Sequence, residues 1–155
     1  MWWRLKRSVW EKQKGNGNRK AFKKIVESGE VPGLLAYVRG QPAGWICVES
    51  REAFPVLENS RILKSVDEQP VWSVVCLFVS KPFRRKGLSV ELLRAAIAHA
   101  MKRGAKIVEG YPNDPGKGAM PDAFAFMGLV SAFREARFQE VARRSPGRPI
   151  MRYTQ

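Results

Sequence analysis

The alternation of apolar and polar positions divides the chain into short helices and strands. Three apolar side chains at helical spacing within residues 19–28 predict an amphipathic helix. The apolar and aromatic runs 33–38 and 43–48 flank residues 39–42, whose sequence Arg-Gly-Gln-Pro is typical of a tight turn. We therefore expect a helix followed by two antiparallel strands.

The strongest pattern lies in the middle of the chain. Residues 71–79 are almost wholly apolar and rich in β-branched and aromatic types, which is typical of a strand covered on both faces. Residues 88–103 have apolar positions at helical spacing and end at Gly104, and residues 106–111 form another apolar run. This order predicts a strand–helix–strand crossover whose two strands are parallel neighbours.

Other segments have weaker patterns. Residues 2–5 are a candidate first strand, and residues 51–70 indicate a loop with one helical turn. We expect the rest of the chain to form a loop at 110–121, a helix at 124–136 and a closing hairpin of strands 138–142 and 150–153.

Length and composition favour one folding unit over residues 1–155, with 45% apolar residues to build a core. No apolar run approaches the roughly 18 residues needed to cross a bilayer, and the first residues lack the apolar stretch of a signal peptide. Cys47 and Cys76 lie in apolar surroundings without metal-ligand spacing, so we expect buried free thiols and a reducing, cytoplasmic setting.

The net charge of +14 is unevenly distributed. Residues 1–24 carry nine basic residues and one acidic residue, and residues 81–104 carry seven and one, whereas residues 25–80 carry four and seven. A protein that only coated phosphate backbones would have little use for an acidic middle. The distribution favours a site between an anionic ligand and a cationic one.

One turn has the features of an anion site. It consists of Arg84, Arg85, Lys86, Gly87, Leu88 and Ser89. Free backbone N–H groups and the positive end of a helix dipole meet where a buried strand passes into a helix, so a pyrophosphate can bind there. The sequence is neither a Walker A loop nor a dinucleotide fingerprint. The alternative is a solvated basic turn in which Gly87 only permits a bend.

In this setting the turn resembles the Arg/Gln-x-x-Gly-x-Gly/Ala signature of the GNAT superfamily of N-acetyltransferases. The resemblance extends to the hairpin at 33–48, the buried strand, the crossover helix and a late helix followed by Phe138. It implies an α/β (α+β) fold with a mixed, mostly antiparallel sheet, splayed at one parallel strand pair and flanked by helices. Acetyl-CoA would enter at the splay, and its acetyl group would pass directly to a primary amine without a covalent intermediate or a metal.

The resemblance also assigns cofactor contacts. It implies main-chain contacts from Leu77, Phe78 and Val79 to the pantetheine arm, as in strand addition. The pyrophosphate would lie on residues 84–89, and the N–H of Val79 or its neighbour would stabilise the oxyanion.

Two positions depart from the family pattern. Ser89 replaces Gly or Ala, which is sterically tolerable. Phe133 stands where many members have the tyrosine that protonates the departing thiolate, so the usual acid is missing. Coenzyme A thiolate is itself a tolerable leaving group, since a thiol pKa is about 8.5. Tyr111 and Tyr153 are candidate substitutes; packing roles are the alternative.

The resemblance gives the general base to Glu109. A lysine-like acceptor has only about one molecule in 2,500 neutral at pH 7, which corresponds to roughly 4.6 kcal/mol of deprotonation. Glu109 matches a glutamate that some members use to take this proton. The alternative is an ion pair with Lys106 or Arg103. Ser73 stands where other members have a different catalytic glutamate.

Several other side chains have two interpretations. Glu49, Glu52, Asp67 and Glu68 attract a cationic acceptor or are ordinary surface charges. Trp10, Trp45, Trp72 and Phe78 stack on bases or belong to the core. His99 lacks the partners of a triad or metal site, which favours packing.

The partners we expect are acetyl-CoA and an amine that the sequence does not identify, with no membrane and no nucleic acid. The chain is short at its N-terminus for this family, so a homodimer partner is a candidate for the missing acceptor wall. Two competing functions are a non-catalytic acyl-CoA-binding module and a nucleic-acid-associated protein that uses the basic residues 1–24.

Overall fold

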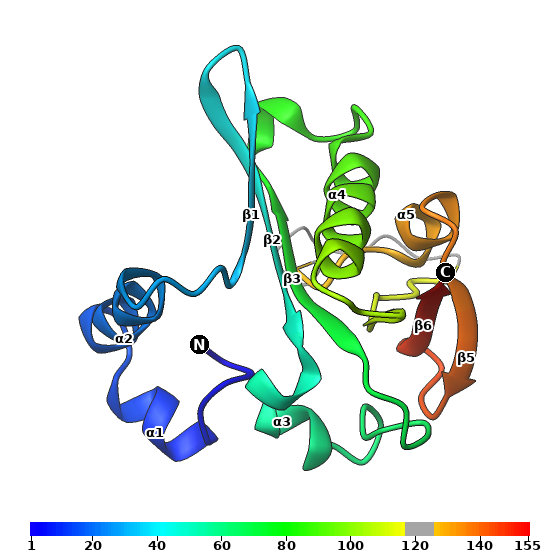
Figure 1. Cartoon of the computed structure of the whole chain (residues 1–155), viewed down its shortest axis with the longest axis horizontal. Coiled ribbons are helices and arrows are strands. Elements are labelled where there is room, and N and C mark those ends of the chain that lie inside the picture. The colour runs from blue at the N-terminus through cyan, green and yellow to red at the C-terminus, as the bar shows by residue number, and fades with distance from the viewer. Residues whose placement is uncertain (117–125) are drawn as a thin grey trace.

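A six-stranded mixed sheet organises the computed structural model, which describes residues 1–116 and 126–155 (Figure 1). The helices are α1 (Arg7–Lys12), α2 (Asn16–Glu27), α3 (Pro55–Glu58), α4 (Leu88–Lys102) and α5 (Val130–Glu135), with short 3-10 turns η1 (Arg51–Ala53) and η2 (Lys81–Phe83). The strands are β1 (Gly33–Val38), β2 (Gln41–Ser50), β3 (Trp72–Val79), β4 (Ile107–Gly110), β5 (Gln139–Arg143) and β6 (Pro149–Thr154).

The strand order is β1-β2-β3-β4-β6-β5, and β3–β4 is the parallel pair in this sheet of described residues. The other neighbouring strands are antiparallel. Strands β3 and β4 pair only from Trp72↔Val108 to Val74↔Gly110, whereas β3 continues to Val79. The sheet is therefore mostly antiparallel and opens after the first half of its parallel pair, which confirms the predicted fold class.

A β-bulge marks the point where the pair opens. Cys47 of β2 is opposite Cys76, but the next residue, Val48, is opposite Val74, so Val75 is an extra residue on β3. A bulge bends its strand and increases the local twist. Here it lies where β3 leaves β4.

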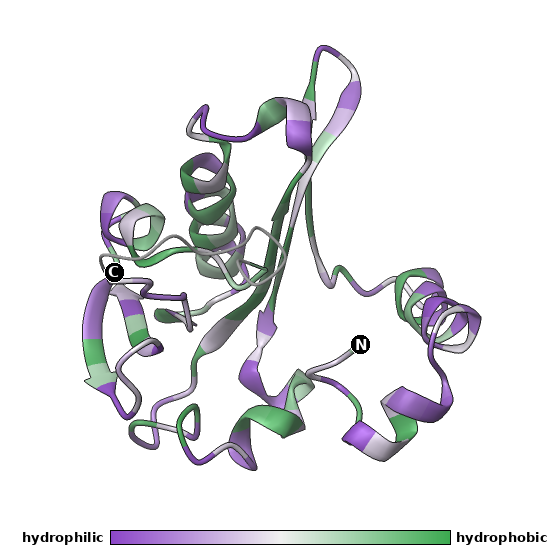
Figure 2. Cartoon of the chain, turned by 180° about the vertical axis from the view of Figure 1, so that it is seen from behind, coloured by the Kyte–Doolittle hydropathy of each residue, from purple (hydrophilic) through white to green (hydrophobic). Residues whose placement is uncertain are grey.

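Helices cover the two faces of the sheet differently. Helices α4 and α5 lie on one face, and α1 and α2 lie beyond the other (Figure 1). The buried side of α4, including Leu93 and Ala96, packs on Val48 and Val74. A second cluster around Phe54 and Met127 forms on the opposite side. Hydrophobic residues follow the central strands in Figure 2, as two covered faces require.

The N-terminal residues differ from the prediction. Residues 2–5 form a turn in which the carbonyl of Met1 accepts hydrogen bonds from Arg4 and Leu5, so the candidate first strand is wrong. Helix α1 was not predicted, because it buries no residue and so has no apolar stripe; an Arg7–Glu11 pair spans its exposed side. Helix α2 begins at Asn16, three residues before the predicted start.

Most other elements agree with the prediction. The two hairpins and the parallel neighbours are confirmed, and one helical turn, α3, lies in the predicted loop 51–70. Helix α5 is shorter than predicted, and residues 117–125, which include parts of the predicted loop and helix, lie outside the described residues. The expectation that β3 is covered on both faces is wrong at its end, because Phe78 is 52% exposed.

Candidate functional site

The open half of β3 presents main-chain groups on the side where β4 has left it. The N–H of Leu77 points to this edge and donates to the carbonyl of Phe126 over 2.7 Å. Because main-chain directions alternate along a strand, Val79 faces the same edge, whereas the N–H and C=O of Phe78 face β2. An extended ligand at this edge would therefore meet the main chain of Leu77 and Val79, and the main-chain contact expected of Phe78 does not fit this register. Phe78 presents its exposed side chain between them.

The turn between β3 and α4 has the backbone geometry of an anion site. Arg85 and Gly87 both have positive φ, 57° and 79°, and Gly87 is the N-cap of the fifteen-residue helix α4. Within the described chain, no N–H from residues 85–89 donates to a main-chain carbonyl. A non-glycine residue in the left-handed region is uncommon and concentrates at functional sites. Convergent free N–H groups at a helix N-terminus attract phosphate.

Two of the basic side chains stiffen this turn. Arg84 Nε donates to the carbonyl of Val79 over 2.9 Å, and Lys86 Nζ donates to the carbonyl of Pro82 over 3.0 Å. The turn therefore holds its shape through its own side chains, while their positive charge stays beside the N-terminus of α4. A Cβ added at Gly87 would meet no atom within 4 Å, so the space around this position is open to a ligand.

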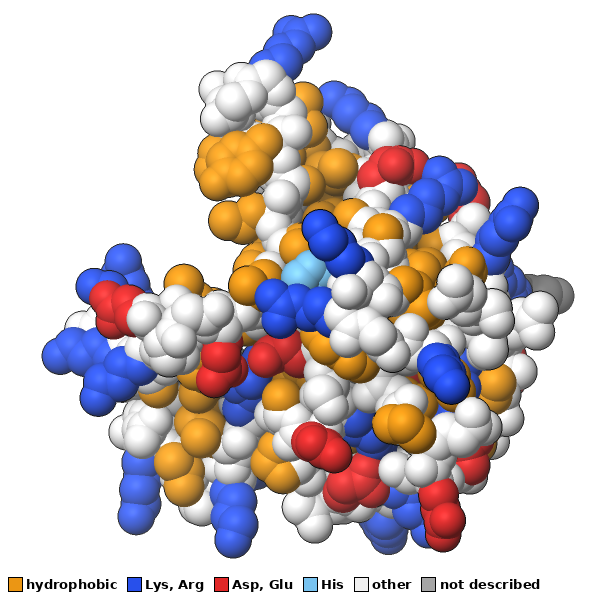
Figure 3. All heavy atoms as spheres, viewed as in Figure 1, with side chains coloured by type: hydrophobic (Ala, Val, Ile, Leu, Met, Phe, Trp, Pro, Cys, Tyr) orange, Lys and Arg blue, Asp and Glu red, His pale blue; other side chains and the backbone are white. Residues whose placement is uncertain are grey.

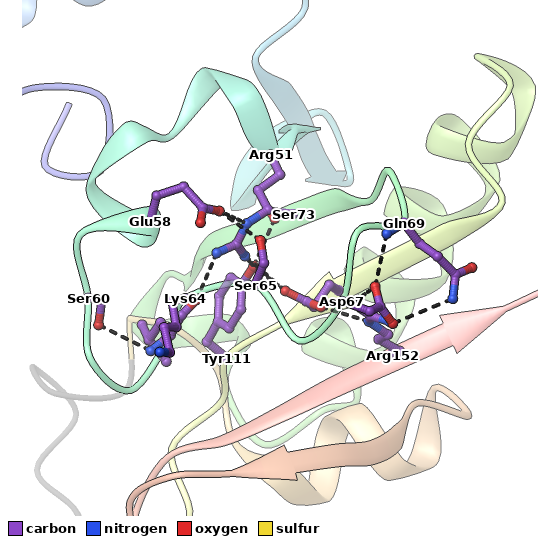
Figure 4. Close-up of polar contacts among 12 residues, drawn as sticks. Arg51, Glu58, Ser60, Lys64, Ser65, Asp67, Gln69, Ser73, Tyr111 and Arg152 are labelled. Atoms are coloured by element: carbon purple, nitrogen blue, oxygen red, sulfur yellow. Dashed lines mark hydrogen bonds and ion pairs between the residues drawn. The ribbon is translucent and has the colours of Figure 1, made fainter.

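Glu109 is fully buried in a cluster of polar and charged groups, and its partners Arg51, Tyr111 and Arg152 are labelled in Figure 4. Arg51 Nη1 donates to Glu109 Oε1 over 2.9 Å, and Arg152 Nε donates to Oε2 over 2.7 Å. The Tyr111 hydroxyl also donates to Oε1, over 2.6 Å, and lies 2.9 Å from Ser73 Oγ. Both carboxylate oxygens are therefore engaged.

The outer side of the cluster is also paired. Arg152 bonds both oxygens of Asp67, at 2.6 and 3.1 Å, and Arg51 forms an ion pair with Glu58. Burial and the Glu109 carboxylate raise the pKa of Tyr111 well above its usual value, so its hydroxyl stays a donor. The predicted alternative partners, Lys106 and Arg103, are wrong. Arg51 and Arg152 come from distant parts of the chain, and no sequence spacing signalled them.

Phe133, which occupies the position where the resemblance leads us to expect a tyrosine, is fully buried. Its ring packs on Phe138 with centroids 4.8 Å apart and lies against Gly110, the last residue of β4. The Tyr111 hydroxyl donates to Glu109 and lies beside Ser73, in the paired half of β3, and the Tyr153 ring packs on Phe138. The tyrosine acid of the family therefore has no counterpart at position 133.

A cavity of about 590 Å³ lies between the N-terminal segment and the sheet, on the face opposite α4. Its walls are Met1, Trp2, Trp3, Arg4, Trp10, Lys14, Gly15, Asn18, Arg19, Phe22, Trp45, Cys47, Phe54, Val75, Cys76 and Phe126. We call it the N-terminal cavity. The bulged part of β3 forms its floor, immediately before Leu77 on the strand. Sequence reasoning missed this cavity because its aromatic residues come from segments without a clear period.

The acidic residues of the middle segment do not line this cavity. Glu49 forms an ion pair with Arg4, and Asp67 binds Arg152. The prediction that these two carboxylates attract a cationic acceptor is therefore not supported by their contacts. Trp45 lines the cavity, whereas His99 and Trp72 pack together with centroids 5.9 Å apart, as the packing interpretation expects.

Other kinds of site are not evident in the described ranges. No described helix is long and apolar enough to span a bilayer. Among the same residues, no three His, Cys, Asp or Glu side chains gather closely enough to hold a metal ion. Cys47 and Cys76 form no disulfide; Cys47 is buried and Cys76 half-buried.

Comparison with known proteins gives consistent similarities. Residues 1–120 match the family model described as the acetyltransferase (GNAT) family. An uncharacterised N-acetyltransferase of Methanocaldococcus jannaschii is 26% identical over 99 residues, which are 64% of this chain and 39% of that protein. The chain thus spans well under half the length of this curated relative.

Solved structures share the fold at low sequence identity. A ribosomal-protein-alanine N-acetyltransferase from Brucella melitensis superimposes with a TM-score of 0.55 and 15% identity, covering 89% of this chain and 76% of that one. The PaiA N-acetyltransferase of Thermoplasma acidophilum, solved with coenzyme A, gives a TM-score of 0.56 and 13% identity, with coverage of 96% and 77%. With the splayed parallel pair and the glycine turn at α4, the family match shows that this chain belongs to the GNAT family of acetyltransferases.

Proposed function

We propose that this protein transfers the acetyl group of acetyl-CoA directly to a primary amine. The observation that carries the proposal is the open edge of β3 beside the free N–H groups that precede α4. The edge suits an extended pantetheine arm, and the turn suits a pyrophosphate. The coenzyme A bound to the Thermoplasma neighbour supports this choice of cofactor.

The proposed cofactor contacts divide between strand and turn. The main-chain groups of Leu77 and the N–H of Val79 would bind the pantetheine arm, since the Val79 carbonyl accepts from Arg84. The N–H groups of residues 85–89 would bind the phosphates. Arg84 and Lys86 would add charge from the side chains that brace the turn. For the pantetheine to occupy the edge, the Phe126 carbonyl has to leave the N–H of Leu77.

In the proposed reaction the amine nitrogen attacks the thioester carbonyl carbon. A C–N bond forms, the C–S bond breaks, coenzyme A leaves as a thiolate, and the amine loses one proton. A main-chain N–H at the β3 edge would stabilise the oxyanion of the tetrahedral intermediate. Among the described residues, no cysteine or serine has an activating partner that would call for a covalent intermediate.

Glu109 stays our proposed acceptor for the amine proton, provided that a proton can reach its buried carboxylate. Because its carboxylate is fully buried and both oxygens accept hydrogen bonds, the proton has to arrive through Tyr111 and Ser73 or through displacement of a partner. Ser73 and Tyr111 are themselves fully buried, so a relay through their hydroxyl groups also requires a rearrangement that connects Ser73 to the amine.

Calorimetric titration with acetyl-CoA tests the cofactor assignment. Gly87→Asp should lower the affinity at least tenfold, because a negative side chain would stand where the pyrophosphate binds. Gly87→Asn is the matched control, since Asn also tolerates positive φ but adds no charge. Equal affinities of the two folded variants would remove the anion site.

Thiol release from acetyl-CoA with a panel of amines tests the transfer itself. Binding of acetyl-CoA without thiol release for any amine would favour a non-catalytic acyl-CoA-binding module. That second candidate draws support from Phe133, which cannot donate a proton, and from the engaged carboxylate of Glu109.

A further inference from the structure

The walls of the N-terminal cavity have an unusual composition for a site that receives an amine. Aromatic side chains dominate, with Trp2 and Trp10 in edge-to-face contact at 4.9 Å and Phe22 and Trp45 at 5.9 Å. The described walls contain no Asp or Glu. An aliphatic polyamine or an aminoglycoside needs carboxylates to replace the water around several ammonium groups, and these walls offer none.

The charges that do line the cavity are positive. Arg4 is neutralised by Glu49. Lys14 lies with Nζ 5.3 Å from the centre of the Trp10 ring, and neither Lys14 nor Arg19 pairs with a carboxylate in the described chain. Two cations beside aromatic walls suit a ligand that combines a flat apolar group with an anion.

Besides Arg4 Nη2, which forms the ion pair with Glu49, two buried polar atoms of the same walls lack hydrogen-bond partners among the described residues. Trp3 Nε1 is a donor and Asn18 Oδ1 is an acceptor. Buried polar atoms without partners are rare, so they call for a ligand or water.

From this composition we infer that the acceptor is a small aromatic amino acid or a close relative, with a primary amine, an aromatic body and a carboxylate. The aromatic body would lie against Trp10 and Trp45, and the carboxylate would bind Lys14 and Arg19. The amine would then face the bulge at Val75 and Cys76, beside the proposed thioester position. This inference rests on the proposed acetyl transfer and names its substrate class.

The same charges bear on the chemistry. A positively charged environment disfavours an ammonium group and so lowers the pKa of a bound amine. An α-amino group also starts from a lower pKa than a lysine side chain. A larger fraction of the bound amine is then already neutral, so the reaction depends less on a base. This suits a site whose candidate base, Glu109, accepts hydrogen bonds from two arginines.

Four probes separate the contributions in a thiol-release assay with acetyl-CoA: L-tryptophan, tryptamine, L-alanine and spermidine. Tryptophan should have the highest kcat/KM, at least tenfold above tryptamine, which lacks the carboxylate, and above alanine, which lacks the ring. Spermidine should be the poorest substrate. A preference for spermidine or alanine would overturn the inference while leaving acetyl transfer intact.

Charge variants give the sharper test. Lys14→Ala and Arg19→Ala should each lower kcat/KM for tryptophan about tenfold and leave tryptamine unchanged. Lys20→Ala, which removes an exposed charge from the same helix without touching the cavity, should leave both substrates unchanged. Equal losses for tryptophan and tryptamine would contradict a carboxylate site.

Direct binding distinguishes failure of the inference from failure of the proposed function. Calorimetry measures L-tryptophan binding to the protein saturated with coenzyme A, which cannot react. Binding that Lys14→Ala weakens, without turnover of any amine, would support the aromatic amino acid site and refute the transferase. Turnover of another amine, without tryptophan binding, would refute the site and retain the transferase.

Discussion

At the scale of single residues, the Glu109 carboxylate is fully buried and accepts three hydrogen bonds. Burying one carboxylate and two guanidinium groups is unfavourable unless each is paired, and here the hydrogen bonds of Arg51, Arg152 and Tyr111 meet that need. The hydrogen bonds of the cluster therefore tie β4, β6 and the segment after β2 together.

Replacing Glu109 by Gln should separate structural and chemical roles. We expect a loss of about 3 kcal/mol or more in the free energy of unfolding, because two buried guanidinium groups lose their counter-charge. Urea unfolding measures it, with Glu140→Gln as the control for an exposed pair, expected to lose less than about 1 kcal/mol.

Kinetics of the same variant address the base. If Glu109 is the base, Glu109→Gln should lower the turnover of the enzyme by a factor of about 10² to 10⁴. The acidic limb of the pH–rate profile should then move or vanish. Acetyl-CoA affinity should be unchanged. Wild-type turnover with an unaltered pH profile would assign the residue to structure alone.

Cys47 gives a prediction of pH dependence. Burial raises the pKa of its thiol from 9.0 to about 11. Only the thiolate reacts, so at pH 8 iodoacetamide should modify Cys47 about a hundredfold more slowly than an unperturbed thiol, with a rate that rises about tenfold per pH unit toward pH 11.

The same shift has a consequence for stability. The folded state holds the Cys47 proton more tightly than the unfolded state does. The protonated thiol therefore contributes its full stability below pH 9, and this contribution is lost as the pH rises through 11. Mass spectrometry of the alkylated protein, with Cys47→Ser to isolate Cys76, measures the rates. Rapid modification at pH 8 would show that the site is more open than its burial indicates.

At the scale of elements, the sequence predicted the strands and helices that have a periodic apolar pattern and missed those that have none. The apolar run of β3, the period of α4 and Gly87 between them specify a crossover, because burial on two faces and a helix start leave local signals. Helix α1 leaves none, since it buries no residue.

The same distinction between local and tertiary features applies to the candidate site. The turn at 84–89 lies within one local element and could be predicted. The partners of Glu109 could not, because Arg51 and Arg152 meet it only through the strand order and register. The aromatic walls of the N-terminal cavity come from separate segments, so no spacing in the sequence joins Trp10 to Trp45.

Gly110 tests the packing where the parallel pair ends. A Cβ at this position would lie 2.2 Å from Cε1 of Phe133, so Gly110→Ala should destabilise the protein by about 1 to 3 kcal/mol through overpacking. Gly147→Ala is the control, because its Cβ would meet only the carbonyl of Asp114 at 3.7 Å; we expect a change within about 0.5 kcal/mol.

A double variant completes this test. Adding Phe133→Leu to Gly110→Ala should recover part of the loss, since the smaller side chain relieves the contact. Thermal and urea unfolding measure all four proteins. Additive losses in the double variant would contradict direct contact between the two residues.

At the scale of the whole molecule, the net charge of +14 produces a long-range positive field, whereas the proposed binding sites contact their ligands directly. Lys and Arg side chains project around the outline of the molecule in Figure 3. The proposed phosphate site instead relies on main-chain N–H groups of residues 85–89. The overall field should therefore govern how fast an anionic cofactor arrives, and the turn should govern how long it stays.

Salt separates these two contributions. Raising NaCl from 0.1 to 1 M shortens the Debye length from about 10 Å to about 3 Å, so we expect the association rate of acetyl-CoA to fall about tenfold while its dissociation rate changes less than about threefold. Stopped-flow mixing measures both rates. Lys23→Gln with Lys24→Gln, two exposed charges outside the cavity walls, should slow association at 0.1 M salt only. An association rate independent of salt would mean that the charge serves another ligand, and sub-micromolar, steeply salt-dependent binding of a DNA duplex would then favour nucleic acid.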